Sequence, residues 1–271
     1  MSSVEPKPAA SVVLVRPGSA EPVELYMIRR QEAMRFLGGF YAFPGGRVSP
    51  ADATPETVAR VRGLDAETAA ERLRNEEGLP SLAFWVAAIR ELFEETGVLM
   101  ACDAQGAPID HGDPAVADQV ERSRKALMAG EAGLTALLAR AGWFYDAAPL
   151  RYLAHFITPP SSPIRFTARF FVSPLHAGQE PRLFFEETSE GFWIGAREGY
   201  RRCRAGEFAM AEPQEYALGY LAQFNSLDDL WAAHADGRHK FHGIVDRVEF
   251  YGAGYDWTQG VWTSEKPPWH P

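Results

Sequence analysis

Apolar residues recur at helical spacing in the stretch between Ser81 and Gly97. They are Leu82, Trp85, Val86, Ile89, Leu92 and Phe93. Residues three and four positions apart lie on the same face of a helix, so this spacing predicts a helix with a buried stripe. Ser81, after Pro80, is a suitable N-cap residue, and Gly97 supplies a stop signal at the carboxyl end. We therefore expect one well-packed helix between these two residues.

Short runs rich in β-branched and aromatic residues predict strands elsewhere in the chain. Residues 10–15 and 23–28 flank the turn signal Pro17-Gly18-Ser19, which favours a hairpin. Further strands are expected at residues 151–158, 165–172 and 191–194. Strands before and after a central helix indicate a protein that mixes both kinds of element.

Helical patterning also occurs outside the central stretch. The expected helices cover residues 55–61, 65–76, 114–128, 133–141, 216–224 and 227–234. Asp65 is a suitable N-cap for the second of them, and Gly78-Leu79-Pro80 interrupts the pattern before the central helix. Leu134, Leu137 and Leu138 form an apolar stripe, which is typical of core packing. We expect the last two helices to be structural.

The polar face of the central helix gathers three carboxylates. Glu91, Glu94 and Glu95 are spaced at i, i+3 and i+4, where like charges destabilise an isolated helix by roughly 0.2–0.5 kcal/mol per pair. A divalent cation would neutralise them, and carboxylate oxygens suit Mg²⁺ or Mn²⁺. The alternative is a solvated acidic face in which Arg90 pairs with Glu94 at i, i+4. These residues alone leave both interpretations open.

A glycine-containing motif upstream, Phe43-Pro44-Gly45-Gly46, adds to this pattern. Together with residues 90–98 it resembles the box of the Nudix hydrolases, G-x5-E-x7-R-E-U-x-E-E-x-G-U, in which U is aliphatic. The matching residues are Gly46, Arg90, Glu91, Leu92, Glu94, Glu95, Gly97 and Val98. Asp52 stands where the family has Glu, and residues 53–89 replace a seven-residue spacer. The second half of the box is complete, and the insertion leaves its acids intact.

The resemblance implies an α/β (α+β) fold in which a mixed β-sheet is sandwiched between helices. Residues 1–271 would form a single Nudix hydrolase domain, long enough to bury a full core. A helical insertion at 53–80 would lie inside the box as a lid or a packing element. Residues 114–141 would add a second helical segment.

The resemblance also implies a catalytic role for the box. Glu91, Glu94 and Glu95, with the backbone carbonyl of Gly46, would hold one to three Mg²⁺ or Mn²⁺ ions against a diphosphate. Arg90 would orient the carboxylates and bond to Asp52. Glu91 is the first choice for the general base.

Further site candidates lie outside the box. Nudix enzymes often recruit an acid from a later loop, which makes Glu187 and Glu190 candidates for a metal ligand or base. Arginines are suited to gripping phosphate. Those expected to bind substrate are Arg30, Arg35, Arg165 and Arg169. In a strand, Arg165 and Arg169 would share one face, and exposed basic side chains are the alternative for them.

Patches from about residue 12 to 231 resemble the Nudix branch that contains the mammalian peroxisomal coenzyme A diphosphatase. Arg30, Arg35, Gly39 and residues 43–46 agree with the coenzyme A signature of related Nudix enzymes. Three positions depart from it: Gln31 replaces Ser, Leu37 replaces His and Ser49 replaces Asp. The substrate implied is a small nucleoside diphosphate derivative, first among them coenzyme A or its acyl esters.

The composition of the chain limits the class of protein, its partners and its location. The chain has 271 residues, 46% of them hydrophobic, which is typical of a globular protein, and its net charge of −9 argues against a nucleic-acid partner. The two cysteines, Cys102 and Cys203, lack metal-ligand spacing and are expected to be free thiols. No run of about 20 apolar residues predicts a membrane span. We expect a cytoplasmic protein, and family analogy alone allows a homodimer.

Three functions compete at this point. The first is metal-dependent hydrolysis of coenzyme A compounds, and the second is the same chemistry on ADP-ribose, NADH-type dinucleotides or nucleotide sugars. The third is a non-catalytic nucleotide-binding Nudix module. Modules of that kind usually lose a box glutamate, whereas Glu91, Glu94 and Glu95 are all present here.

Overall fold

The computed structural model describes residues 4–34, 37–75, 77–183 and 188–245, and the backbone of three short strands beyond them. The main sheet contains β1 (Lys7–Pro17), β2 (Val23–Arg30), β3 (Tyr41–Ala42), β4 (Gly45–Arg47), β8 (Arg151–Ile157), β9 (Phe166–Pro174), β10 (Thr188–Gly195), β11 (Phe241–Ile244) and β12 (Glu249–Phe250). A small sheet contains β5 (Val61–Arg62), β6 (Ala101–Cys102) and β7 (Phe144–Asp146). Two short strands, β13 (Tyr255–Asp256) and β14 (Val261–Trp262), pair with each other.

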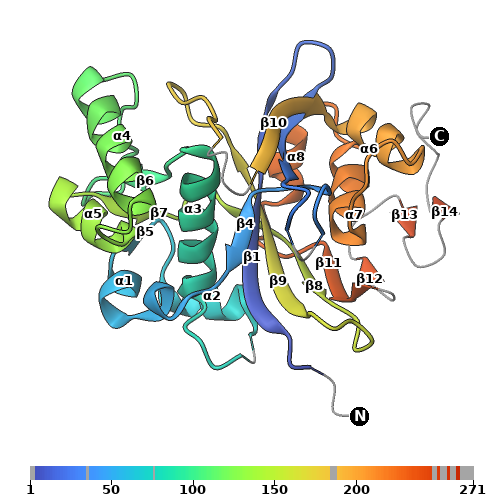
Figure 1. The fold of residues 1–271 in the computed structure, drawn as a ribbon, viewed down its shortest axis with the longest axis horizontal. Helices are drawn as coiled ribbons and strands as arrows, with labels where there is room; N and C mark the ends of the chain where they lie inside the picture. The colour runs from blue at the N-terminus through green and yellow to red at the C-terminus, as the bar shows by residue number, and fades with distance from the viewer. Residues whose placement is uncertain are drawn as a thin grey trace.

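The helices fall into two groups (Figure 1). The first group is α1 (Pro55–Ala59), α2 (Ala66–Leu73), α3 (Leu82–Thr96), α4 (Pro114–Met128) and α5 (Leu134–Ala141). The second is α6 (Ala196–Arg204), α7 (Glu212–Leu221) and α8 (Leu227–Ala233). A short 3-10 turn, η1 (Pro50–Ala53), precedes α1. Figure 1 shows the main sheet standing between the two groups.

The main sheet is mixed, with the order β10-β2-β1-β9-β8-β11-β12. Neighbouring strands β1 and β2 run antiparallel, as the predicted hairpin requires, whereas β1 and β9 run parallel. The glycine-containing strand β4 pairs with β1, with Gly46 opposite Ala10. This pairing places the glycine motif beside the middle of the sheet.

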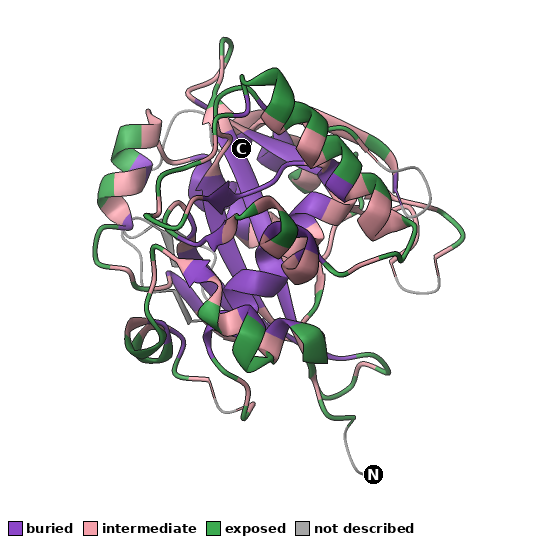
Figure 2. Ribbon diagram, turned by 90° about the vertical axis from the view of Figure 1, so that its left-hand side faces the viewer, coloured by how far each residue is buried: buried purple, intermediate pink, exposed green. Residues whose placement is uncertain are grey.

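The two faces of the sheet bury different side chains, which explains why helices cover both. Along β1, Ala10, Val12 and Leu14 belong to the core cluster on the α3 side, while Val13 and Val15 belong to the cluster on the α6–α8 side. This alternation follows from the two-residue period of a strand. Figure 2 shows the resulting buried interior beneath exposed outer helix faces. The expected sandwich of a mixed sheet between helices is confirmed.

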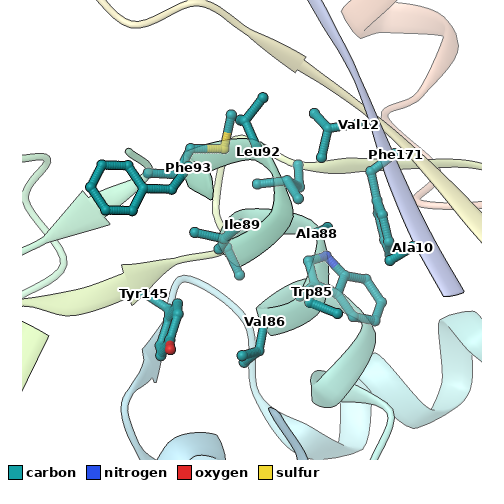
Figure 3. Close-up of a cluster of buried hydrophobic side chains, with 14 of the residues drawn as sticks. Ala10, Val12, Trp85, Val86, Ala88, Ile89, Leu92, Phe93, Tyr145 and Phe171 are labelled. Carbon is teal, nitrogen blue, oxygen red and sulfur yellow. The ribbon is translucent and has the colours of Figure 1, made fainter. Parts of the chain in front are cut away.

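Helix α3 is the centre of one core cluster, as Figure 3 shows. Its predicted stripe is buried: Trp85, Ile89 and Phe93 have 0% exposure. They pack with Val12 of β1, Phe171 of β9 and residues of the small sheet. Each such side chain contributes about 1.5–3 kcal/mol of burial free energy. The helix that carries the three glutamates is therefore firmly held on its apolar side.

The sequence pattern missed one helix, α6, which begins at Ala196. Only Ala196, Gly199 and Tyr200 are buried in it, and four of its nine residues are arginines. Two of the three buried residues are too small to give a clear apolar period. The first predicted piece of the insertion also proved shorter, since Val61 lies in strand β5.

The insertion packs against the fold and does not cover the carboxylates. Val61, Ala69 and Leu73 join the core cluster around α3. Glu77, in the loop before α3, forms an ion pair with Arg169 of β9 at 2.9 Å, where the Arg169 side chain is 1% exposed. Of the two roles expected for the insertion, packing is therefore the one that these contacts show.

Both cysteines are free thiols, as expected, and Cys102 is buried. Over the residues that the structure describes, no helix is both long enough and apolar enough to cross a membrane.

The Glu77–Arg169 pair gives a stability prediction. We expect Glu77→Ala to lower the free energy of unfolding by about 3 kcal/mol, because it leaves the buried Arg169 charge without its carboxylate. Urea unfolding followed by circular dichroism measures this change. Glu121→Ala is the matched control, since its ion pair with Lys125 is exposed on α4, and it should change stability by less than about 1 kcal/mol. Equal losses in both variants would contradict the prediction.

Candidate active site

Residues from both halves of the Nudix-like motif line one large cavity. Its volume is about 1040 Å³, and its wall includes Gly45, Gly46, Glu91, Glu94 and Glu95. Strand β4 supplies the glycines and the last two turns of α3 supply the glutamates. The three carboxylates that the helical spacing placed on one face therefore lie along one cavity wall.

Arg90 joins the parts of this wall. Its guanidinium has five N–H groups, and all five donate. Nε and Nη2 reach the two Asp52 oxygens, each at 2.8 Å. Nη1 reaches Glu91 Oε1 at 2.8 Å and Glu94 Oε2 at 3.0 Å, and Nη2 also donates to the Arg47 carbonyl at 2.9 Å. One side chain thus connects η1, β4 and α3.

Asp52 fits the position where the family has Glu. It is 2% exposed, and besides Arg90 it accepts a hydrogen bond from the Ser49 amide at 2.7 Å. The contact between Arg90 and Asp52, which the sequence suggested, is present. Burial lowers the pKa of Arg90, but the hydrogen bond to Asp52 and the charge of Glu91 outweigh it and leave that pKa raised. Arg90 is therefore a permanent cation in this wall.

Glu91 is the most perturbed of the three glutamates. Burial raises its pKa to about 7, with Arg90 opposing the shift and Glu94 adding to it. Its carboxylate also packs against the Gly46 backbone, where an added Cβ would come within 2.5 Å of Glu91. The glycine at position 46 is thus required by the close approach of this carboxylate.

The other two glutamates have different partners. Glu95 Oε2 accepts a hydrogen bond from the Gly45 amide at 2.9 Å, which ties the end of α3 to β4. Glu94 makes the i, i+4 pair with Arg90 that the acidic-face alternative predicts. That pair belongs to a larger network on a cavity wall, so a simple solvated face does not describe this helix.

The donor set suits a hard divalent cation. Three carboxylates and a backbone carbonyl are oxygen ligands of the kind that Mg²⁺ and Mn²⁺ take. Burial raises the pKa of Glu91, and the charge of Glu94 adds to this rise. Within the described residues, however, no three acidic, His or Cys side chains already converge on a metal position. Arg90 and the Gly45 amide hold the carboxylates instead. A bound cation would therefore compete with these donors for the carboxylate oxygens.

Basic residues line the same cavity. Arg30, at the end of β2, is among them, as expected, and Lys7 and Arg47 lie on the wall as well. The sequence pattern did not single out Lys7 or Arg47 as substrate-binding residues. Arg47 lies next to Gly46 in the box, a position that could have indicated it. Arg35 lies outside the described residues.

The structure does not bring Arg165 and Arg169 to the cavity. Their neighbours on the other face of the strand, Phe166, Ala168 and Phe170, line it instead. Arg169 bonds to Glu77 and lies over the ring of Phe84, on the α3 side of the sheet. The Arg165 guanidinium donates to the carbonyls of Thr158 and Val4. The alternation was anticipated, but the apolar face is the one turned to the cavity, so we correct the assignment of both arginines to substrate.

The two acids predicted after the box, Glu187 and Glu190, are not found at the cavity wall among the described residues. Glu187 lies outside the described residues. Glu190 forms an ion pair with Arg29 at 3.1 Å and is not part of the cavity wall. Of the two proposed general bases that the structure describes, Glu91 and Glu190, Glu91 is the one that lines the cavity.

An apolar wall was not anticipated. The residues of this wall are Phe156 of β8, Phe166 and Phe170 of β9, Met210 just before α7, and Val245 just after β11. The start of α7, which the sequence suggested was structural, contributes Glu212, Pro213 and Gln214. A local pattern shows that such side chains are buried or half-buried, but it does not show which cavity they face.

Comparison with known proteins identifies the family. A family model for the NUDT19 Nudix domain matches residues 6–221, which is more than half of the chain. The chain belongs to this Nudix family. It is a Nudix hydrolase, as its box suggested, and belongs to the NUDT19 branch, as the resemblance in patches along the chain suggested.

Individual relatives agree with this assignment. The chain is 28% identical over 273 residues to the acyl-coenzyme A diphosphatase NUDT19 of Gallus gallus, a match that covers 84% of this chain and 71% of that protein. A crystal structure of a Nudix hydrolase from Alicyclobacillus acidocaldarius is similar with a TM-score of 0.71 and 31% sequence identity, over 85% of this chain and 97% of that one. The Nudix fold therefore extends over most of this hydrolase.

The Arg90 network gives a second stability prediction. Arg90→Met leaves the buried Asp52 carboxylate without its ion-pair partner, so we expect the free energy of unfolding to fall by about 3–5 kcal/mol. Denaturant unfolding at neutral pH measures the fall. Arg140→Met, at an exposed arginine on α5, should change stability by less than about 0.5 kcal/mol. An Arg90→Met protein as stable as this control would show that the network does not hold the wall together.

Proposed function

We propose that this Nudix hydrolase is a metal-dependent pyrophosphohydrolase of coenzyme A or acyl-coenzyme A. Its products would be 3',5'-ADP and 4'-phosphopantetheine or the acyl form of the latter. The main support for the proposal is that the cavity has a charged part and an apolar part. Carboxylates and basic side chains line one part of it, and Phe156, Phe170 and Met210 line another. The name of the Gallus gallus relative, acyl-coenzyme A diphosphatase, supports the same substrate class.

Mg²⁺ or Mn²⁺ would be held by Glu91, Glu94 and Glu95 together with the Gly46 carbonyl. When bound, such an ion neutralises diphosphate charge and stabilises the leaving phosphate. Before a cation binds, Arg90 keeps Glu91 and Glu94 at the wall by its bonds to both. Its hold on Asp52 would keep the η1 turn in place while the carboxylates change partners.

The reaction adds one water molecule across the phosphoanhydride. The water oxygen bonds to one phosphorus atom, and the bond between that phosphorus and the bridging oxygen breaks. Glu91 would accept the proton of the attacking water, since it is the first choice for the general base and lines the cavity with the other two glutamates. Glu187 and Glu190 remain the other candidates for this role.

The rest of the cavity would orient the substrate. Arg30, Lys7 and Arg47 would contact the phosphate groups, since each lines the same cavity as the glutamates. The apolar wall would accept the pantetheine arm and an acyl chain. Burial of each methylene there would contribute about 0.8 kcal/mol, so longer acyl esters should bind more tightly.

A second candidate substrate class is ADP-ribose, NADH-type dinucleotides or nucleotide sugars. It is favoured by one observation: Leu37, at a position where the coenzyme A signature of related Nudix enzymes has His, lines the cavity. The same hydrolysis would apply to all of these molecules, because each contains a diphosphate between two larger groups.

A substrate panel distinguishes these possibilities. Coenzyme A, acyl-coenzyme A, ADP-ribose, NADH and a nucleotide sugar are each incubated with the enzyme, with Mg²⁺ or Mn²⁺ or with a chelator. We expect metal-dependent product release that is fastest on coenzyme A compounds and absent with chelator. Faster turnover of the other substrates would reject the coenzyme A assignment and favour the second class.

Substitution of the box glutamates tests the site itself. Glu94→Gln removes a charge that holds the cation, so we expect kcat to fall by about 10²-fold or more. Steady-state kinetics on the best substrate of the panel measures the fall. Glu121→Gln, an exposed glutamate on α4, is the control and should leave kcat unchanged. If Glu94→Gln retained full turnover, our assignment of the metal site would be wrong.

A further inference from the structure

We propose that Arg124 of α4 is a positioning residue for the active site. By capping the carboxyl end of α3, it would hold the helical turn that carries Glu94 and Glu95. This inference rests on the proposed metal-dependent function. It assigns a role to the helical segment at 114–141, whose contribution the Nudix box does not explain.

The first observation is how α3 ends. In a continuing helix the Val98 amide would donate to the Glu94 carbonyl, four residues earlier. Here the Val98 amide donates to Thr96 Oγ1 at 3.2 Å instead. The Arg124 guanidinium takes the place of that amide, since its Nη2 donates to the Glu94 carbonyl at 3.3 Å. Arg124 therefore donates a hydrogen bond to one of the carbonyls that have no amide partner at the end of a helix.

The second observation is at the glycine of the box. Gly97 has φ +73°, and a Cβ at this position would lie 2.6 Å from Arg124 Nη1. There are therefore two reasons for a glycine at position 97: the backbone is left-handed, and the guanidinium approaches closely. A cation at this point also lies at the negative end of the helix dipole. The two features place Arg124 against the end of α3 by geometry and by charge.

The effect should be local to the last turn. Upstream residues of α3 such as Trp85 and Ile89 are completely buried and do not depend on Arg124. In the last turn, Phe93 and Thr96 are also buried, and their carbonyls accept hydrogen bonds from the Gly97 and Arg182 amides. The Glu94 carbonyl, on the polar side of this turn, accepts its bond from Arg124. Loss of the Arg124 cap would remove this donor from the Glu94 carbonyl and loosen the polar side of the turn. The Glu94 and Glu95 carboxylates would then be held less well for a cation.

Mn²⁺ binding to the substrate-free protein tests this role directly. Electron paramagnetic resonance of free Mn²⁺ gives the binding constant, and thermal unfolding of each variant gives its stability. We expect Arg124→Met to weaken Mn²⁺ binding by about tenfold, in the range seen when a group that orients metal ligands is removed. Arg124→Lys, which keeps the charge on a flexible stem, should recover part of the loss.

The matched control is Arg122→Met. Arg122 is exposed on the same helix and bonds to Gln119 at 3.0 Å, so its loss should leave Mn²⁺ binding unchanged. A lower melting temperature for Arg124→Met with wild-type Mn²⁺ binding would overturn the proposal and leave Arg124 a purely structural residue. Equal weakening by Arg122→Met would overturn it as well.

The two proposals fail in different ways. Because the binding assay uses no substrate, a wild-type protein that binds Mn²⁺ but does not hydrolyse coenzyme A rejects only the proposed substrate. A wild-type protein that takes up no Mn²⁺ would reject the role of Arg124 together with the metal site.

Discussion

The site depends on one guanidinium. Arg90 uses all five of its N–H groups to join Asp52, the Arg47 carbonyl, Glu91 and Glu94. Without this cation, three carboxylates would share a partly buried wall with little compensation, which is unfavourable in a medium of low dielectric constant. The same bonds connect the glycine strand to the helix. A single side chain therefore both offsets part of the carboxylate charge and joins the elements that form this wall.

The rest of the fold holds the two ends of this network in place. Helix α3 is fixed by its buried stripe, and β4 is fixed by pairing with β1. The insertion between the halves of the box leaves this arrangement intact because it packs beside α3 and is anchored by the Glu77–Arg169 pair. The 37 residues 53–89, in place of a seven-residue spacer, are tolerated because the two ends of the segment need only meet the same two elements.

Much of the fold and the centre of the site could be predicted from the sequence. The helical period located α3, and the spacing of the three glutamates placed them on one wall. Helix α6 was not predicted because two of its three buried residues are small and give no clear apolar period. Arg165 and Arg169 could not be placed for a different reason. Alternation along a strand separates its two faces but does not show which face lines the cavity. Partners such as Glu77, 92 positions away, are set by tertiary contacts that no local pattern contains.

The central claim is that the three glutamates and the Gly46 carbonyl share a divalent cation. The most direct measurement is anomalous diffraction from crystals of the protein grown with Mn²⁺ and ADP. The account predicts anomalous density between the ADP phosphates and Glu91, Glu94 and Glu95, with Arg90 still bonded to Asp52. Density elsewhere, with the carboxylates still bonded to Arg90 and the Gly45 amide, would contradict it.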